Sequence, residues 1–139
     1  MTERGAGEGM RADPLLVASG LVYGAAGLGL IFLPVETISA IGAGAAPAGV
    51  WVAQITGAAL FALSQLNWMQ RFAKVGGIFG RPVLVPNVVF TTVAFFASVR
   101  SWRREPERLE IAVAATVLAV LGMLFMMRLL ARPRAEPAA

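Results

Sequence analysis

Cysteine and histidine are absent from the sequence, and charged residues make up only 14% of it. Without cysteine there is no disulfide and no thiolate nucleophile or metal ligand. Without histidine there is no imidazole-ligated haem or metal and no Ser-His-Asp triad. Soluble domains carry about 25% charged residues. The shortage of charge therefore excludes a soluble enzyme, a disordered tail and a secreted disulfide scaffold.

Apolar residues are abundant instead, at 58% of the chain, and the mean hydropathy is +0.72. A membrane-spanning helix needs about 20 mostly apolar residues. The sequence predicts an all-α integral membrane protein, a transmembrane bundle of four helices that occupies residues 14–130. Residues 1–13 and 131–139 are expected to be tails. The four spans are predicted at about 14–33, 50–72, 83–99 and 109–130.

A short segment after the first span is predicted to lie at the membrane surface. Pro34 ends the span, and Val35, Ile38 and Ile41 then recur three residues apart before Gly42. This spacing favours a short interfacial helix between the first and second spans. The first span itself exceeds the roughly 7–15 apolar residues of a signal peptide, so we expect it to stay in the membrane.

The lysine and arginine residues predict the orientation in the membrane. With the N-terminus in the cytoplasm, eight of them lie on the cytoplasmic side and four on the other side. Cytoplasmic loops are enriched in positive charge. We therefore expect a multi-pass protein of a bacterial inner membrane with both termini in the cytoplasm. The positive charge is then expected to set the orientation in the membrane and to attract anionic lipid head groups, rather than nucleic acid. The expected partners are the lipid bilayer and another membrane protein or a second copy.

None of the eight acidic residues lies in the middle of a predicted span. Ion pathways and proton relays in membranes usually carry an ionisable group at that depth. Proton-coupled antiport therefore has no evident carrier in this chain. The same shortage of reactive groups leads us to expect no enzymatic activity, no cofactor and no metal site.

Uncharged polar residues form one face on each of the two middle spans. At 100° per residue, Gln54 and Gln65 share a face of the second span, and Asn87 and Thr91 share a face of the third. An amide that faces lipid is costly, so both faces are predicted to point into the bundle. They would form either interhelical hydrogen bonds or a polar cavity for a small ligand.

Three glycines lie along one side of the first span: Gly20, Gly24 and Gly27. Small residues at such spacing let helix backbones approach closely. We expect this face to pack within the bundle rather than to form a dimer seam.

The segment between the second and third spans is a further candidate site. Trp68 is suited to anchor at the membrane interface. Gly76, Gly77 and Gly80 permit a tight loop with exposed backbone N–H groups, and Arg81 adds a cation. Such a loop can hold a lipid phosphate or a carboxylate. A plain tight turn with an arginine as topology signal is the alternative.

The patterns QxxGA at 54–58, LNW at 66–68 and GGIFGRP at 76–82, followed by Asn87 and Phe90, resemble a group of small bacterial four-helix membrane proteins of no established function. The resemblance covers about residues 50–95. Members often carry a histidine two residues after the asparagine, where this chain has Val89. The resemblance implies the membrane-embedded fold and assigns no catalytic residue, binding residue or cofactor.

Three functions fit these patterns. The leading interpretation is a structural or accessory membrane protein that binds lipid or a partner membrane protein through its helix faces. One alternative is a small oligomeric transporter or exporter with a path lined by the polar faces of the second and third spans. Another is a subunit of a membrane enzyme that holds a quinone-like ligand near Trp68 and Arg81.

Overall fold

The computed structural model describes residues 12–42, 46–72 and 81–131, and this part of the chain contains helices and no strand. The helices, in chain order, are α1 (Pro14–Phe32), α2 (Pro34–Ala40), α3 (Pro47–Met69), α4 (Arg81–Arg104) and α5 (Leu109–Leu130). All but the short α2 are long and apolar enough to cross a membrane. The prediction of an all-α architecture with four candidate spans and a short helix between the first two is confirmed.

Proline sets the start of three of these helices. Pro14, Pro34 and Pro47 each occupy a first helical position, where the fixed φ of proline is favourable and its missing N–H is no loss. The Asp13 side chain also caps α1 by accepting a hydrogen bond of 2.9 Å from the backbone N–H of Leu15. Because of Pro47, α3 begins three residues before the predicted start of the second span.

Helix α4 is longer than the predicted third span. The third span was predicted to end at about residue 99, but the helix continues to Arg104. Arg103 and Arg104 lie in its last turn, where positive charge favours the carbonyl end of a helix. Pro86 is accommodated inside α4, at the cost of one backbone hydrogen bond.

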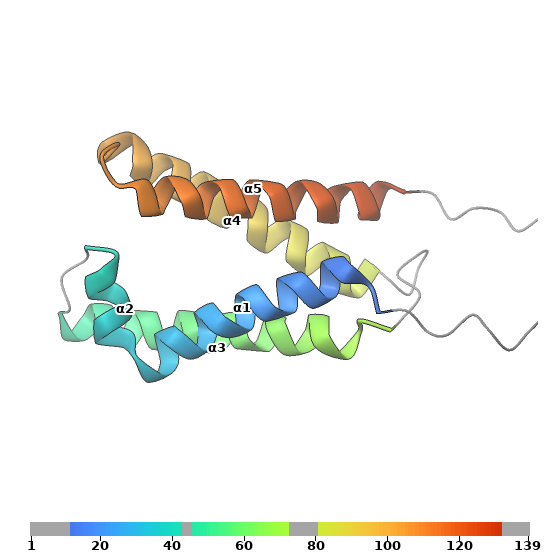
Figure 1. Cartoon of the computed structure of the whole chain (residues 1–139), viewed down its shortest axis with the longest axis horizontal. Helices are drawn as coiled ribbons and strands as arrows, with labels where there is room; N and C mark the ends of the chain where they lie inside the picture. The colour runs from blue at the N-terminus through green and yellow to red at the C-terminus, as the bar shows by residue number, and fades with distance from the viewer. Residues whose placement is uncertain (1–11, 43–45, 73–80, 132–139) are drawn as a thin grey trace, which may run out of the picture.

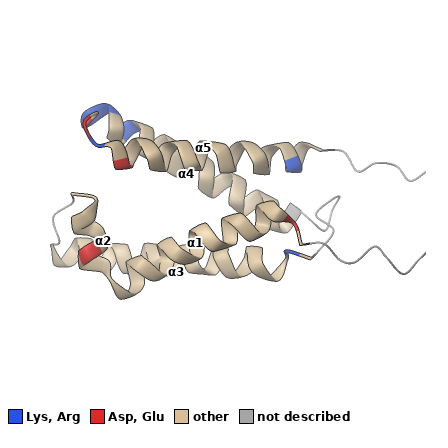
Figure 2. Ribbon diagram, in the orientation of Figure 1, with Lys and Arg blue, Asp and Glu red and all other residues tan. Residues whose placement is uncertain are grey.

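Charged residues gather at the two ends of the bundle, while its middle is free of them in the described part of the chain (Figure 2). At one end Arg128 of α5 pairs with Asp13, which begins α1. The backbone N–H of Asp13 also donates to the carbonyl of Arg71 at the end of α3, over 2.6 Å. The first and last spans therefore begin and end on the same side of the bundle (Figure 1).

The four long helices form two tightly packed pairs, α1 with α3 and α4 with α5 (Figure 1). Glycines make the α1–α3 contact close: a Cβ on Gly27 would lie 2.8 Å from the carbonyl oxygen of Gly57. Gly20 and Gly24 both face Ser64. The prediction that this glycine face packs within the bundle is confirmed.

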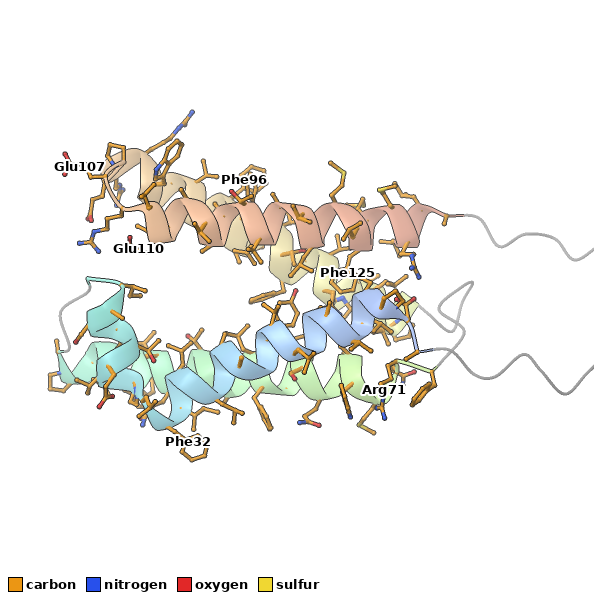
Figure 3. All side chains as sticks on the ribbon, in the orientation of Figure 1. Phe32, Arg71, Phe96, Glu107, Glu110 and Phe125 are labelled. Atoms are coloured by element: carbon orange, nitrogen blue, oxygen red, sulfur yellow. The ribbon has the colours of Figure 1, made fainter. Side chains whose placement is uncertain are left out.

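The two pairs meet mainly through the first half of α4, which crosses from the α1–α3 pair to α5 (Figure 1). The core at this crossing includes Leu16, Leu84 and Phe125, all at most 3% exposed. Phe125 lies between α5 and α1, whereas Phe32 and Phe96 point away from the bundle (Figure 3). Towards the α4–α5 turn the two pairs diverge.

Candidate functional site

A reciprocal amide pair joins α3 to α4 inside the bundle. The side-chain amide nitrogen of Asn67 donates to Oδ1 of Asn87 over 3.0 Å, and that of Asn87 donates to Oδ1 of Asn67 over 2.7 Å. Both side chains are 0% exposed. Two amides that exchange hydrogen bonds satisfy each other where neither water nor lipid can do so.

The remaining donors of the pair are also satisfied. Asn67 donates to Oγ of Ser19 on α1 over 2.9 Å, and Asn87 donates to the carbonyl of Val83 over 2.8 Å. Thr91, one turn beyond Asn87, donates to the carbonyl of Asn87 over 2.7 Å. The network thus links α1, α3 and α4 with no side-chain donor left for a ligand, and its geometry suits interhelical attachment.

The four polar residues predicted to share the bundle interior divide into two sets. Asn87 and Thr91 are fully buried, as expected. The expectation that Gln54 and Gln65 also point inward is wrong, because both side chains are exposed on the outer side of α3. The four residues therefore do not line one path within a single chain.

Small residues, rather than polar ones, decide which face of α3 packs inward. The buried positions of α3 include Ala53, Gly57 and Ser64. Ser64 also donates a hydrogen bond of 2.7 Å to the carbonyl of Gly20. These residues let α1 approach the α3 backbone, and the close contact between the two helices turns Gln54 outward.

Asn67 is the buried polar residue that the sequence reasoning did not assign to the polar face. It belongs to the LNW pattern, and its partner Asn87 was expected only to face inward. The available signal was the symmetric spacing in the sequence: Asn67 comes ten residues before Gly77, and Asn87 comes ten residues after it. Two antiparallel spans joined by one loop bring such positions to the same depth.

An apolar cavity of about 340 Å³ lies between the two helix pairs. All four long helices contribute to its wall, with Tyr23 from α1, Leu60 from α3, Phe90 and Ala94 from α4, and Leu118 from α5. We call it the inner cavity. Its volume falls at the lower end of the range of about 300–1,000 Å³ for small-molecule sites.

Tyr23 stands in the wall of the inner cavity with an unsatisfied hydroxyl. Its side chain is 2% exposed, and its ring meets Phe90 edge-on with centroids 5.3 Å apart. The hydroxyl has no hydrogen-bond partner among the described residues. A buried tyrosine hydroxyl usually finds a partner, so this one calls for an explanation.

A second cavity, of about 480 Å³, continues from the first towards the α4–α5 turn. Ala114 lines both cavities. The second one, which we call the mouth, has a largely apolar wall that also carries Ser98, Arg104 and Glu110, and Ile41 contributes to it from the end of α2. Together the two cavities form a cleft that is apolar inside and charged at its end.

Arg108 links the two helix pairs at the mouth by hydrogen bonds to the end of α2. Its guanidinium donates to the carbonyl of Ile41 over 2.7 Å and to that of Gly42 over 3.3 Å, and it also pairs with Glu105. Gly42 has a φ of +67°, a conformation that favours glycine. We call these contacts the Arg108 latch.

The loop predicted as an anion site is described only at its edges. Gly76, Gly77, Gly80 and the side chain of Arg81 lie outside the described residues. Trp68 is 41% exposed at the end of α3.

The cation that the structure places on Trp68 is Arg71. Its guanidinium lies 4.2 Å from the centre of the Trp68 ring and 4.4 Å from that of Phe72. The sequence signal was the spacing of three residues on one helix end, which brings a cation over an aromatic ring.

These features define a multi-pass integral membrane protein, since four apolar helices span the length of a bilayer and the charges lie at their ends. No family model, curated protein or solved structure matches the chain. The resemblance to small bacterial four-helix membrane proteins stays a prediction.

Proposed function

We propose that this protein is a non-enzymatic accessory protein of a bacterial inner membrane that holds a lipid between its two helix pairs. The observation that carries the proposal is the inner cavity, which has an apolar wall built from all four spanning helices. A lipid chain fits such a wall because it needs apolar contact and no hydrogen bonds.

The mouth supports an amphipathic ligand rather than a plain hydrocarbon. Arg104 lies in its wall beside Glu110 and Ser98. A lipid with its chain in the inner cavity would place its polar head group among these residues, where the guanidinium of Arg104 can bind a phosphate or a carboxylate. We also propose that the opposite end of the bundle, where Asp13 pairs with Arg128, faces the cytoplasm.

Native mass spectrometry of the protein purified in a mild detergent tests this proposal. Ala94→Phe fills the inner cavity from α4, while Val93→Phe adds the same group to the neighbouring position, which is 64% exposed on the outside. We expect the wild type and Val93→Phe to retain a lipid mass that Ala94→Phe loses. Circular dichroism and the melting temperature verify that both variants fold. Equal lipid retention by the two variants, or none in the wild type, would overturn the proposal.

A quinone-like ligand is a second candidate, favoured by the unsatisfied hydroxyl of Tyr23. Tyr23 lies at the tenth of the 19 positions of α1, at mid-membrane depth, where a phospholipid presents only hydrocarbon. A quinone carbonyl in the inner cavity could accept a hydrogen bond from this hydroxyl. Tyr23→Phe should then weaken binding of an added ubiquinone analogue at least fivefold and leave phospholipid retention unchanged. An unchanged quinone affinity would exclude this candidate.

A further inference from the structure

The outer face of α3 presents two amides to the lipid. Gln54 and Gln65 are both exposed, and the hydrogen bonds of the described residues include none from either side chain. Ala58 is the middle residue of α3. At 1.5 Å per residue, Gln54 lies about 6 Å and Gln65 about 10 Å along the helix from that centre, inside the roughly 15 Å half-thickness of the hydrocarbon layer.

Amides at this depth need a polar partner. Hydrocarbon offers no hydrogen bond, and an unsatisfied amide in an apolar medium costs several kcal/mol. The chain's own helices do not supply the partner, because they pack against the other side of α3, at Ala53, Gly57 and Ser64. Within the described part of the chain nothing supplies that partner, and a helix of a neighbouring molecule can supply it.

The spacing of this face is that of a helix–helix seam. Exposed or half-exposed residues recur along α3 at alternating intervals of three and four, the a and d positions of a heptad repeat. We call this set the α3 seam: Trp51, Gln54, Ala58, Phe61, Gln65 and Trp68. The small Ala58 at its centre permits close approach of a second helix, and the two glutamines can hydrogen-bond across it.

We propose that the α3 seam binds the α3 seam of a second copy, as a parallel two-fold dimer. Where all copies insert in one orientation, two α3 helices that meet are parallel and each seam residue faces its own counterpart. A glutamine amide carries both donor and acceptor, so Gln54 can satisfy Gln54 of the partner and Gln65 can do the same. A polar residue at a heptad core position also fixes the register of two helices.

This inference stands apart from lipid binding, because the inner cavity touches α3 through Leu60, which is not a seam residue. Loss of a bound lipid in Ala94→Phe would leave the dimer in place. Loss of the dimer would leave the cavity between the helix pairs of each chain.

Cysteine crosslinking in native membranes tests the dimer, since the chain has no cysteine of its own. Ala58→Cys places a thiol on the seam, and Ala59→Cys places one at the same depth but about 100° away around α3. Mild oxidation should convert most Ala58→Cys protein to a covalent dimer of twice 14.6 kDa, and at least fivefold less of Ala59→Cys. Equal crosslinking of the two variants, no dimer, or an adduct with a different protein would overturn the proposal.

The role of the amides is tested by Gln54→Leu together with Gln65→Leu. Energy transfer between labelled copies in liposomes measures the dissociation constant of the dimer. We expect this constant to be at least tenfold higher in the double variant than in the wild type. Gln70→Leu is the control, because Gln70 lies just beyond α3 and outside the seam. Unchanged or tighter association of the double variant would show that the amides do not hold the dimer.

Discussion

Asn67 and Asn87 lie ten residues on either side of Gly77 in the sequence, and their side-chain amides exchange two hydrogen bonds in a fully buried position. These two asparagines join helix α3, which packs with α1, to the first half of α4. They lie at the end of the bundle where Asp13 and Arg128 meet. The opposite end diverges and contains the mouth. The amide pair thus joins the helix pairs at the end of the bundle opposite the mouth.

The amide pair should show strong energetic coupling. Asn67→Leu or Asn87→Leu alone takes two hydrogen bonds from the remaining buried amide, which keeps only its bond to Ser19 or Val83, so each should lower the free energy of unfolding by about 1–2 kcal/mol. The double variant should cost less than the sum of the two, because it leaves no buried amide with missing hydrogen bonds. Unfolding by SDS titration in mixed micelles measures the free energy of unfolding of the wild type, the two single variants and the double variant, which together form a double-mutant cycle. Strictly additive costs would contradict the coupling.

The fold was largely readable from the sequence because membrane spans depend on local composition. Runs of apolar residues, the prolines and the position of charges locate the four long helices and the short one. The α4 end was missed because Ser101 to Arg104 is polar but still helix-compatible, and a helix can continue past the hydrocarbon layer into water. Composition locates the span and does not locate the end of the helix.

The faces of the helices were harder to predict, since polarity within a span does not reveal which partner satisfies it. Asn87 and Gln65 gave the same sequence signal, an amide in a membrane span. Asn87 meets Asn67 inside the chain, whereas Gln65 faces outward. The α1–α3 contact at Gly27 and Gly57 decided the outcome, and its geometry depends on both helices together.

Gly27 should tolerate no side chain. A Cβ there would lie 2.8 Å from the carbonyl oxygen of Gly57 and 2.9 Å from the backbone nitrogen of Phe61, and neither backbone atom can move without separating the helices. Gly27→Ala should therefore lower the free energy of unfolding by about 1–3 kcal/mol, as overpacking does elsewhere. Gly29→Ala is the matched control, with Thr37 Oγ1 as its nearest atom at 3.6 Å. A similar loss in both variants would contradict the packing explanation, because replacing glycine by alanine inside a helix by itself raises helix propensity.

The proposed orientation predicts which ends react with a membrane-impermeant thiol reagent. Ala46→Cys lies at the start of α3 and Ala131→Cys directly after α5, and both positions are exposed. In intact cells we expect labelling of Ala46→Cys alone, and labelling of Ala131→Cys only after permeabilisation, because positive charge favours the cytoplasmic side. The reverse pattern would invert the orientation and leave the fold unchanged.

The Arg108 latch should control access to the cleft more than it controls stability. Arg108 is partly exposed, and its contacts with Glu105 and with the carbonyls of Ile41 and Gly42 lie at the end of the bundle. Exposed ion pairs contribute at most about 1 kcal/mol, so Arg108→Ala should change the melting temperature little.

The same contacts hold the end of α2 against the α4–α5 turn, so their loss should let the two helix pairs separate at the mouth. A cysteine at Ser98, in the wall of the mouth, should then react with an impermeant maleimide at least threefold faster in Arg108→Ala than in the parent. Arg103→Ala is the control, because it removes one positive charge from the same end of the bundle without touching the latch. If both substitutions accelerate labelling equally, the effect is one of surface charge on the reagent. If neither does, the mouth is open with the latch in place, and Arg108 does not gate the cleft.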